Sequence, residues 1–174
     1  PPFDVAPGAI ASIGPAAGSF DLNQPLFAFA GIGQGDVAAT PLQMALAAAG
    51  IGNGGVIMKP HVGAEIKNSK GKVVRRIANE PWRTATSATT AQAVNTMMTD
   101  VVEQGTGTAA KITGVRVAGK TGTAQADGGP PHAWFIAFAP ADAPRYAVSV
   151  IVERGGSLGS EATGGRIAAP IAAR

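Results

Sequence analysis

Apolar residues recur at helical spacing directly after residue 40. Thr40, Pro41 and Gln43 supply an N-cap hydroxyl, a proline at the first helical position and a glutamine three residues after the cap. Together they form a capping box, which marks a helix N-terminus. Apolar residues then repeat three or four positions apart until segment 50–55, whose glycines end helices. The pattern predicts a helix over residues 40–50.

A second helical pattern begins near Thr89, again with a glutamine three residues later, at Gln92. Its apolar residues lie on one helix face: Val94, Met97, Met98, Val101 and Val102. Gly105 ends the pattern. We predict a helix over residues 89–103 with both methionines in the core.

After this helix the hydrophobic period changes to two, the period of β-strands. Segments 115–125, 133–139 and 146–153 read as three strands joined by short connections rich in Pro, Gly and Asp. Such connections predict an antiparallel meander. The near-continuous apolar runs indicate that helices cover both faces of this sheet. Residues 166–174 have the pattern of a terminal helix packed against it.

Residues 56–66 and 72–77 alternate enough to be two further strands, joined by a turn at 68–71. Five basic residues gather in this region: Lys67, Lys70, Lys72, Arg75 and Arg76. No aromatic residues lie between them, as they would in a nucleic-acid site. We therefore predict a solvated hairpin and expect no nucleic-acid partner.

The first part of the chain carries weaker signals. Residues 1–39 show little period, so we predict loops and turns with Phe27 and Phe29 as apolar anchors. The glycine-rich segment 31–35 is interpreted as a tight turn against the core. No apolar run in the chain reaches the ~18 residues of a membrane-spanning helix.

Composition narrows the possible chemistry. The chain has 174 residues, of which 45% are hydrophobic and 14% charged, which is typical of one folded domain with a real core. Cysteine is absent, so thiol chemistry and thiolate metal sites are excluded. The two histidines, His61 and His132, lie far apart, and we predict no metal site. Because the chain opens at Pro1 and ends at Arg174 within a helical pattern, we expect a fragment of a longer protein.

One segment fits the P-loop formula of a glycine, four residues and Gly-Lys-Thr. It runs from Gly114 to Lys120 and Thr121. The four intervening residues alternate as in a strand, and the glycine-rich segment 122–129 cannot start a stable helix. A P-loop needs a helix N-terminus at that point. The pattern argues against nucleotide binding, which stays open as an alternative.

The same lysine begins a Lys-Thr-Gly triad on a predicted strand, a motif of serine acyl-transferases. Lys120 supplies positive charge near a substrate carboxylate, and the hydroxyls of Thr121 and Thr123 can donate to that carboxylate. Gly122 has no side chain, so a substrate backbone can approach the strand edge. The N–H of Thr123 can form half of an oxyanion hole. We expect Lys120 and Thr123 to be catalytic, and Thr121, Gly122 and Thr123 to bind substrate.

The triad is part of a longer pattern. Segment 118–125 (Ala-Gly-Lys-Thr-Gly-Thr-Ala-Gln), followed by 132–135 (His-Ala-Trp-Phe), resembles the transpeptidase domain of class B penicillin-binding proteins. Further segments are similar to that family in order and spacing: 31–35, 39–44, 101–109, 162–165 and 168–171. The resemblance covers most of residues 28 to 174.

The resemblance implies an α/β (α+β) fold of the penicillin-binding protein and serine β-lactamase type, an antiparallel sheet covered by helices. Residues 1–174 are then the C-terminal portion of the transpeptidase domain. The implied reaction is D,D-transpeptidation: a serine attacks the D-Ala-D-Ala bond of a peptidoglycan stem peptide, and an amine of a second stem peptide resolves the acyl-enzyme. β-Lactams acylate the same serine. No metal or organic cofactor is implied, and the implied location is the extracytoplasmic face of the bacterial membrane, with an N-terminal anchor.

The family's serine motifs set a limit to the resemblance. No Ser-x-Asn occurs in the chain, and Ser69 to Lys72 fits Ser-x-x-Lys but has Gly71 where a helix is needed. We expect the nucleophile upstream of Pro1, on a segment that also covers apolar surface of the predicted helices. A catalytically inactive interaction module, and a carboxypeptidase or β-lactamase of the same fold, stay open as alternatives.

Overall fold

The computed structural model describes residues 12–13, 24–35, 37–126 and 128–174. Its helices and strands, in chain order, are β1 (Ser12–Ile13), α1 (Gln24–Gly31), β2 (Val37–Ala38), α2 (Pro41–Gly52), β3 (Val56–Met58), β4 (Glu65–Lys67), β5 (Val73–Arg76), β6 (Pro81–Thr84), α3 (Ala88–Glu103), η1 (Thr108–Ala110), β7 (Ala118–Ala126), β8 (Gly129–Ala139), β9 (Tyr146–Val152), η2 (Glu153–Glu161), η3 (Gly164–Ala168) and α4 (Ala169–Ala172).

The centre of the molecule is the antiparallel sheet β7-β8-β9, which confirms the predicted meander. Lys120 on β7 lies opposite Ile136 on β8, and Ile136 lies opposite Ser149 on β9. β8 is therefore the middle strand, and β7 leaves one edge without a strand partner among the described residues. The first strand begins at Ala118, three residues later than predicted.

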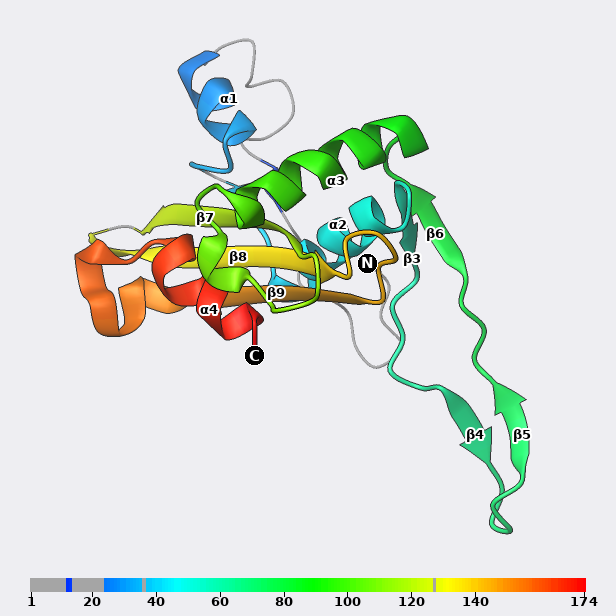
Figure 1. Cartoon of the computed structure of the whole chain (residues 1–174). Coiled ribbons are helices and arrows are strands. Elements are labelled where there is room, and N and C mark those ends of the chain that lie inside the picture. Colours follow the sequence, from blue (N-terminus) through cyan, green and yellow to red (C-terminus); the bar gives the residue numbers. More distant parts are fainter. Residues whose placement is uncertain (1–11, 14–23, 36, 127) are drawn as a thin grey trace.

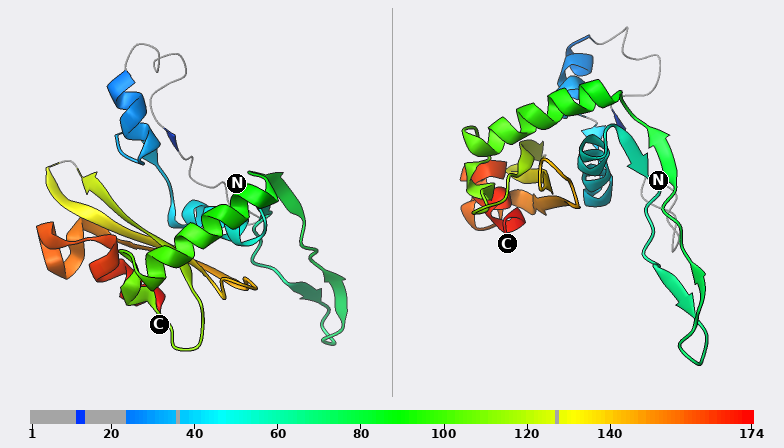
Figure 2. Two further views of the ribbon diagram at one scale, coloured as in Figure 1. Left: turned by 45° about the horizontal axis from the view of Figure 1, so that its top comes forward. Right: turned by 45° about the vertical axis from the view of Figure 1, so that its right-hand side comes forward.

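Helical segments lie on both faces of this sheet, as predicted (Figures 1 and 2). On one face, Ala48 of α2 and Met98 of α3 form a buried cluster with Phe138 of β8. On the other, Phe135 of β8 packs in a second cluster with residues of η3 and α4, such as Ala168. Successive residues of β8 supply opposite faces because side chains alternate along a strand.

Helix α2 begins as its sequence predicts. The Thr40 side chain accepts a hydrogen bond from the Gln43 N–H at 3.2 Å, and the Gln43 side chain accepts one from the Thr40 N–H at 2.7 Å. This reciprocal pair satisfies two backbone donors, one on either side of the helix start. The helix ends at Gly52, two residues beyond the predicted range.

Helix α3 begins at Ala88, with Ser87 as its N-cap, and its buried face includes Met98 and Val102. Met97 is 58% exposed, so the prediction that both methionines lie in the core is wrong for this residue. Neighbouring residues of a helix point about 100° apart, and Met98 alone of the two faces the sheet.

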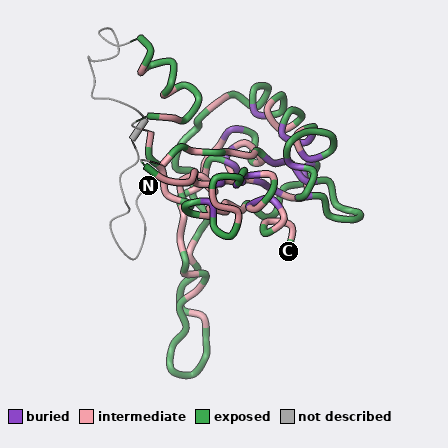
Figure 3. The backbone as a smooth tube through the Cα atoms, turned by 90° about the vertical axis from the view of Figure 1, so that its left-hand side faces the viewer, coloured by how far each residue is buried: buried purple, intermediate pink, exposed green. Residues whose placement is uncertain are grey.

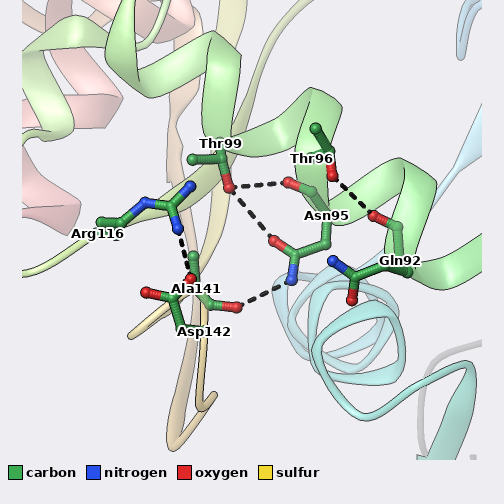
Figure 4. A network of polar contacts seen from close by, with 7 residues as sticks. All are labelled: Gln92, Asn95, Thr96, Thr99, Arg116, Ala141 and Asp142. Carbon is green, nitrogen blue, oxygen red and sulfur yellow. Dashed lines mark hydrogen bonds and ion pairs between the residues drawn. The ribbon is translucent and has the colours of Figure 1, made fainter.

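A polar contact ties α3 to the connection between β8 and β9 (Figure 4). The Asn95 side-chain amide donates to the Ala141 carbonyl at 2.9 Å, and the buried Thr99 hydroxyl donates to the Asn95 carbonyl at 2.9 Å. Arg116 forms an ion pair with Asp142 of the same connection. The hydrogen bond from Asn95 to Ala141 therefore holds α3 to this connection, and the Arg116–Asp142 pair braces the connection from the other side of the same segment.

The strands β4 and β5 form an arm that projects from the body of the molecule and is mostly exposed (Figures 1 and 3). Its tip is the predicted turn at 68–71, where the Asn68 side chain accepts from two backbone N–H groups. The predicted single strand over 56–66 is wrong: it divides into β3 and β4, and β3 pairs with the unpredicted strand β6. Pro60, which has no N–H to donate, lies at the division.

The N-terminal prediction is only partly correct. Residues 24–31 form helix α1 instead of a loop, and Phe27 and Phe29 are 59% and 55% exposed, so neither is an apolar anchor. Segment 31–35 does turn tightly, with positive φ at two glycines, but its residues are not buried. Most of the other residues of the predicted loop region, 1–11, 14–23 and 36, lie outside the described part. No helix among the described residues is long and apolar enough to cross a membrane.

The chain ends in helical turns, as predicted for residues 166–174. A wide turn over Gly164–Ala168 leads into the short helix α4. The Thr163 side chain caps the wide turn by accepting from the Arg166 N–H at 3.3 Å.

Candidate functional site

The Lys-Thr-Gly triad lies in the interior of β7, at the free edge of the central sheet. Lys120 lies opposite Ile136, and Thr123 opposite Ala133. A strand and a hairpin follow the lysine, not the helix N-terminus that phosphate binding by a P-loop requires. The P-loop alternative is therefore wrong.

The Lys120 ammonium lies at the free edge of β7. The side chain is exposed, and its Nζ donates to the Thr121 carbonyl at 2.6 Å. This contact keeps a positive charge beside the backbone groups that the edge strand presents to a ligand.

Gln34 contacts the same edge and was not found by sequence reasoning. Its Nε2 donates to the Thr123 carbonyl at 3.1 Å, and its Oε1 accepts from the Gln125 N–H at 3.3 Å. The Thr123 carbonyl therefore points to the free edge. Because the N–H and C=O of one strand residue point to the same side, the Thr123 N–H faces this edge as well. That is the direction expected of an oxyanion-hole donor.

The hydroxyl of Thr121 has a partner outside the strand. Its Oγ1 lies 2.7 Å from Oγ1 of Thr106, in the segment that follows α3. Thr121 is half-buried and Thr123 is exposed. Both hydroxyl side chains are on one strand face, since they are two residues apart. Thr106 lies in the family-like segment 101–109, but no pattern in the sequence assigned it to the site.

Two glycines of η3 let this turn pack directly behind the triad. A Cβ at Gly164 would lie 2.1 Å from the Trp134 carbonyl oxygen and 2.8 Å from the Gly122 nitrogen. A Cβ at Gly165 would lie 2.1 Å from the Thr106 carbonyl oxygen. The turn therefore supports both Gly122 and the partner of Thr121.

A largely apolar groove of about 410 Å³ opens between α2 and α3, beside Lys120. We call it the α2–α3 groove. Its lining consists of Ala47, Ala48 and Ile51 of α2, Val94, Met97, Met98 and Val101 of α3, and Ile136 and Lys120 of the sheet. Lys120 is the one charged residue in this lining, and the exposed Met97 is one of its apolar residues.

The other candidate residues lie elsewhere. Ser69 is in the turn at the tip of the arm, where Gly71 has a φ of 77°, so it does not begin a helix. Nδ1 of His132 accepts a hydrogen bond from the Arg154 N–H at 3.1 Å. Nδ1 and Nε2 of His61 lie within hydrogen-bond distance of Gly63 and Asn79. Among the described residues, no group of three or more His, Cys, Asp or Glu could hold a metal.

Comparisons with known proteins agree with this architecture. Residues 7–174 match the family model of the penicillin-binding protein transpeptidase domain. The chain is 45% identical over 144 residues to the peptidoglycan D,D-transpeptidase PbpA of Mycolicibacterium smegmatis, covering 80% of this chain and 29% of the relative. It is 35% identical over 164 residues to MrdA of Acinetobacter baumannii, covering 80% of this chain and 23% of the relative.

A solved structure of penicillin-binding protein A from M. tuberculosis, a ceftriaxone acyl-enzyme complex, is also similar. Its TM-score is 0.83 at 38% identity, covering 94% of this chain and 36% of that chain. The fold is thus that of the penicillin-binding enzymes, as predicted. The chain belongs to the family of penicillin-binding protein transpeptidase domains, and its similarity is to the C-terminal region of class B members. It spans less than a third of the length of the curated relatives named here.

Proposed function

We propose that this chain is the C-terminal portion of a serine D,D-transpeptidase domain that cross-links peptidoglycan stem peptides and is acylated by β-lactams. In this proposal β7 is the strand on which the acyl donor binds. The observation that carries it is the free edge of β7, where the Lys120 ammonium contacts the Thr121 carbonyl and, two residues further on, the Thr123 backbone faces outward. The two relatives named as peptidoglycan D,D-transpeptidases support the same reaction. We place that reaction outside the cytoplasm, where peptidoglycan is cross-linked.

The proposed substrate lies antiparallel to β7. The ammonium of Lys120 is at the N-terminal end of the triad, so the terminal carboxylate of the stem peptide binds at that end, assisted by the hydroxyls of Thr121 and Thr123. The penultimate D-Ala carbonyl then lies at the Thr123 N–H, which stabilises the negative charge that develops on its oxygen. Gly122 allows the backbone to approach.

The reaction itself needs a serine hydroxyl, which we place outside residues 1–174. Its oxygen attacks the penultimate D-Ala carbonyl carbon, the peptide C–N bond breaks, and terminal D-Ala leaves with a proton on its nitrogen. An amine of a second stem peptide attacks the resulting ester, forms the cross-link and returns the proton to the serine. Ser149, two strands away from Lys120, is about 10 Å distant by strand spacing and cannot be activated there.

We assign the α2–α3 groove to the segment of the same protein that carries the Ser-x-x-Lys motif. The groove is apolar and borders Lys120, so a helix packed in it would bring a serine near the triad. Burying exposed apolar surface, such as that of Met97, under this segment stabilises the folded protein by about 25 cal/mol per Å².

The test uses the full-length protein and a fluorescent penicillin. Replacing Lys120 by Ala should lower the second-order acylation rate by about 10²-fold or more, because an electrostatic group next to the developing charge is lost. Lys70→Ala, on the exposed arm, is the matched control and should leave the rate unchanged. Mass spectrometry should locate the adduct on a serine outside residues 1–174.

Three outcomes oppose the proposal. An unchanged rate in Lys120→Ala would show that the triad is not the substrate strand. An adduct on a serine within residues 1–174 would refute the placement of the nucleophile. A folded full-length protein without any adduct would favour the inactive interaction module.

A further inference from the structure

Gln34 occupies the edge of β7 at the position where a substrate must pair. Its carboxamide bridges the Thr123 carbonyl and the Gln125 N–H at 3.1 and 3.3 Å. The carboxamide thus occupies two backbone groups of β7 that could otherwise form hydrogen bonds with an added strand.

If the substrate pairs with β7 as in the proposed function, on which this inference rests, it needs the backbone group that Gln34 already contacts. In an antiparallel hydrogen-bonded pair, two residues exchange both of their N–H···O=C bonds. A substrate residue whose carbonyl accepts from the Thr123 N–H therefore directs its own N–H to the Thr123 carbonyl. Gln34 Nε2 already donates to that oxygen.

The direction of the substrate strengthens the conflict. With its carboxylate near Lys120, an antiparallel stem peptide runs from there toward Gln125, so its part preceding the scissile bond passes the bridge made by Gln34. The carboxamide and the substrate amide cannot both occupy this edge.

Gln34 also lies on a lightly packed part of the chain. It follows α1, a helix with no buried residue, and its own N–H donates to the Phe29 carbonyl at 3.0 Å. Segments with few buried contacts move at a low cost in free energy. The side chain can therefore leave the edge without disturbing the sheet.

We infer that the Gln34 carboxamide occupies the position that an amide N–H of the acyl donor takes when it binds. Its hydrogen bond to the Thr123 carbonyl must therefore break before the acyl donor pairs with β7. The residue then discriminates between ligands by whether they bring their own N–H to that carbonyl. A ligand with such an N–H competes with Gln34, and a ligand without one does not.

The experiment compares two β-lactams on the full-length protein. Penicillin G carries an acylamino N–H next to the reactive ring, and imipenem carries a hydroxyethyl group in its place. Gln34→Ala should raise the acylation rate with penicillin G by about 3- to 10-fold, the range of one neutral hydrogen bond. The rate with imipenem should change by less than about 2-fold, so the ratio of the two rates is the readout.

Two further variants make the result decisive. Gln34→Glu keeps an acceptor for the Gln125 N–H but cannot donate to the Thr123 carbonyl, so it should raise the same ratio and serves if the alanine variant fails to fold. Gln24→Ala, at the exposed start of α1, is the control for general loosening and should leave the ratio unchanged. An unchanged or lowered ratio in the folded Gln34 variants would overturn the inference while leaving the proposed function intact. A wild-type protein acylated by neither compound would refute the proposed function itself.

Discussion

A single added methyl group at Gly164 should displace the Lys-Thr-Gly strand and lower both stability and the acylation rate. In Gly164→Ala the new Cβ would start 2.1 Å from the Trp134 carbonyl oxygen, and 2.7 and 2.8 Å from the oxygen and nitrogen of Gly122. All three neighbours are backbone atoms of the central sheet, so none can rotate away. To reach an ordinary contact of about 3.4 Å, η3 must move by about 1.3 Å relative to the sheet.

That displacement has two measurable consequences. Overpacking of a rigid interior costs about 1–3 kcal/mol, and a clash with backbone alone lies at the upper end of that range. A misplacement of about 1 Å in the machinery of an active site costs about 10²-fold in rate. We therefore expect a free energy of unfolding lowered by about 3 kcal/mol and an acylation rate lowered by about 10²-fold.

The assay measures thermal unfolding and β-lactam acylation of the full-length protein side by side. Gly63→Ala is the control, since its Cβ would meet only the Ile77 side chain, at an ordinary 3.7 Å. It should change neither quantity appreciably. A Gly164→Ala variant with wild-type unfolding temperature and acylation within 2-fold of wild type would refute the close packing of η3 behind the triad.

Substitutions at two other residues test local contacts. Thr106→Val removes the hydroxyl that lies 2.7 Å from the Thr121 hydroxyl, and it should slow acylation by carboxylate-bearing β-lactams about 3- to 10-fold. Thr106→Ser keeps a hydroxyl and should restore the rate. Equal acylation rates in the Val and Ser variants would contradict this role. Thr40→Ala removes the N-cap of α2 and should lower the free energy of unfolding by about 1 kcal/mol, measured by denaturant titration, with no change in acylation beyond the loss of folded protein.

The elements fixed by local patterns are those that the sequence predicts well. The capping box at Thr40 specifies the start of α2, because its donors and acceptors lie within three residues of each other. The period of two around Lys120 predicts a strand. A lysine within a strand rules out a P-loop, in which a helix N-terminus follows the lysine. Short connections predict the antiparallel order of β7, β8 and β9.

Long-range partners required the tertiary structure. Strand β3 pairs with β6, which starts at Pro81 and carries no clear period of its own, so its partner stabilises it. The exposure of Met97 depends on where α2 and the sheet lie around α3, which helical spacing alone does not specify.

In the candidate site, too, some residues were predicted from the sequence and others required the tertiary structure. The sequence by itself identified Lys120, Thr121, Gly122 and Thr123 as one candidate strand, because contiguous residues on a strand must share its edge and its two faces. It did not identify Thr106 or Gln34, which lie 15 and 89 residues from their partners on β7. A side-chain hydrogen bond between such distant positions leaves no periodic trace in the chain. Only the packing of α1, η3 and the sheet decided that these groups meet at the edge of β7.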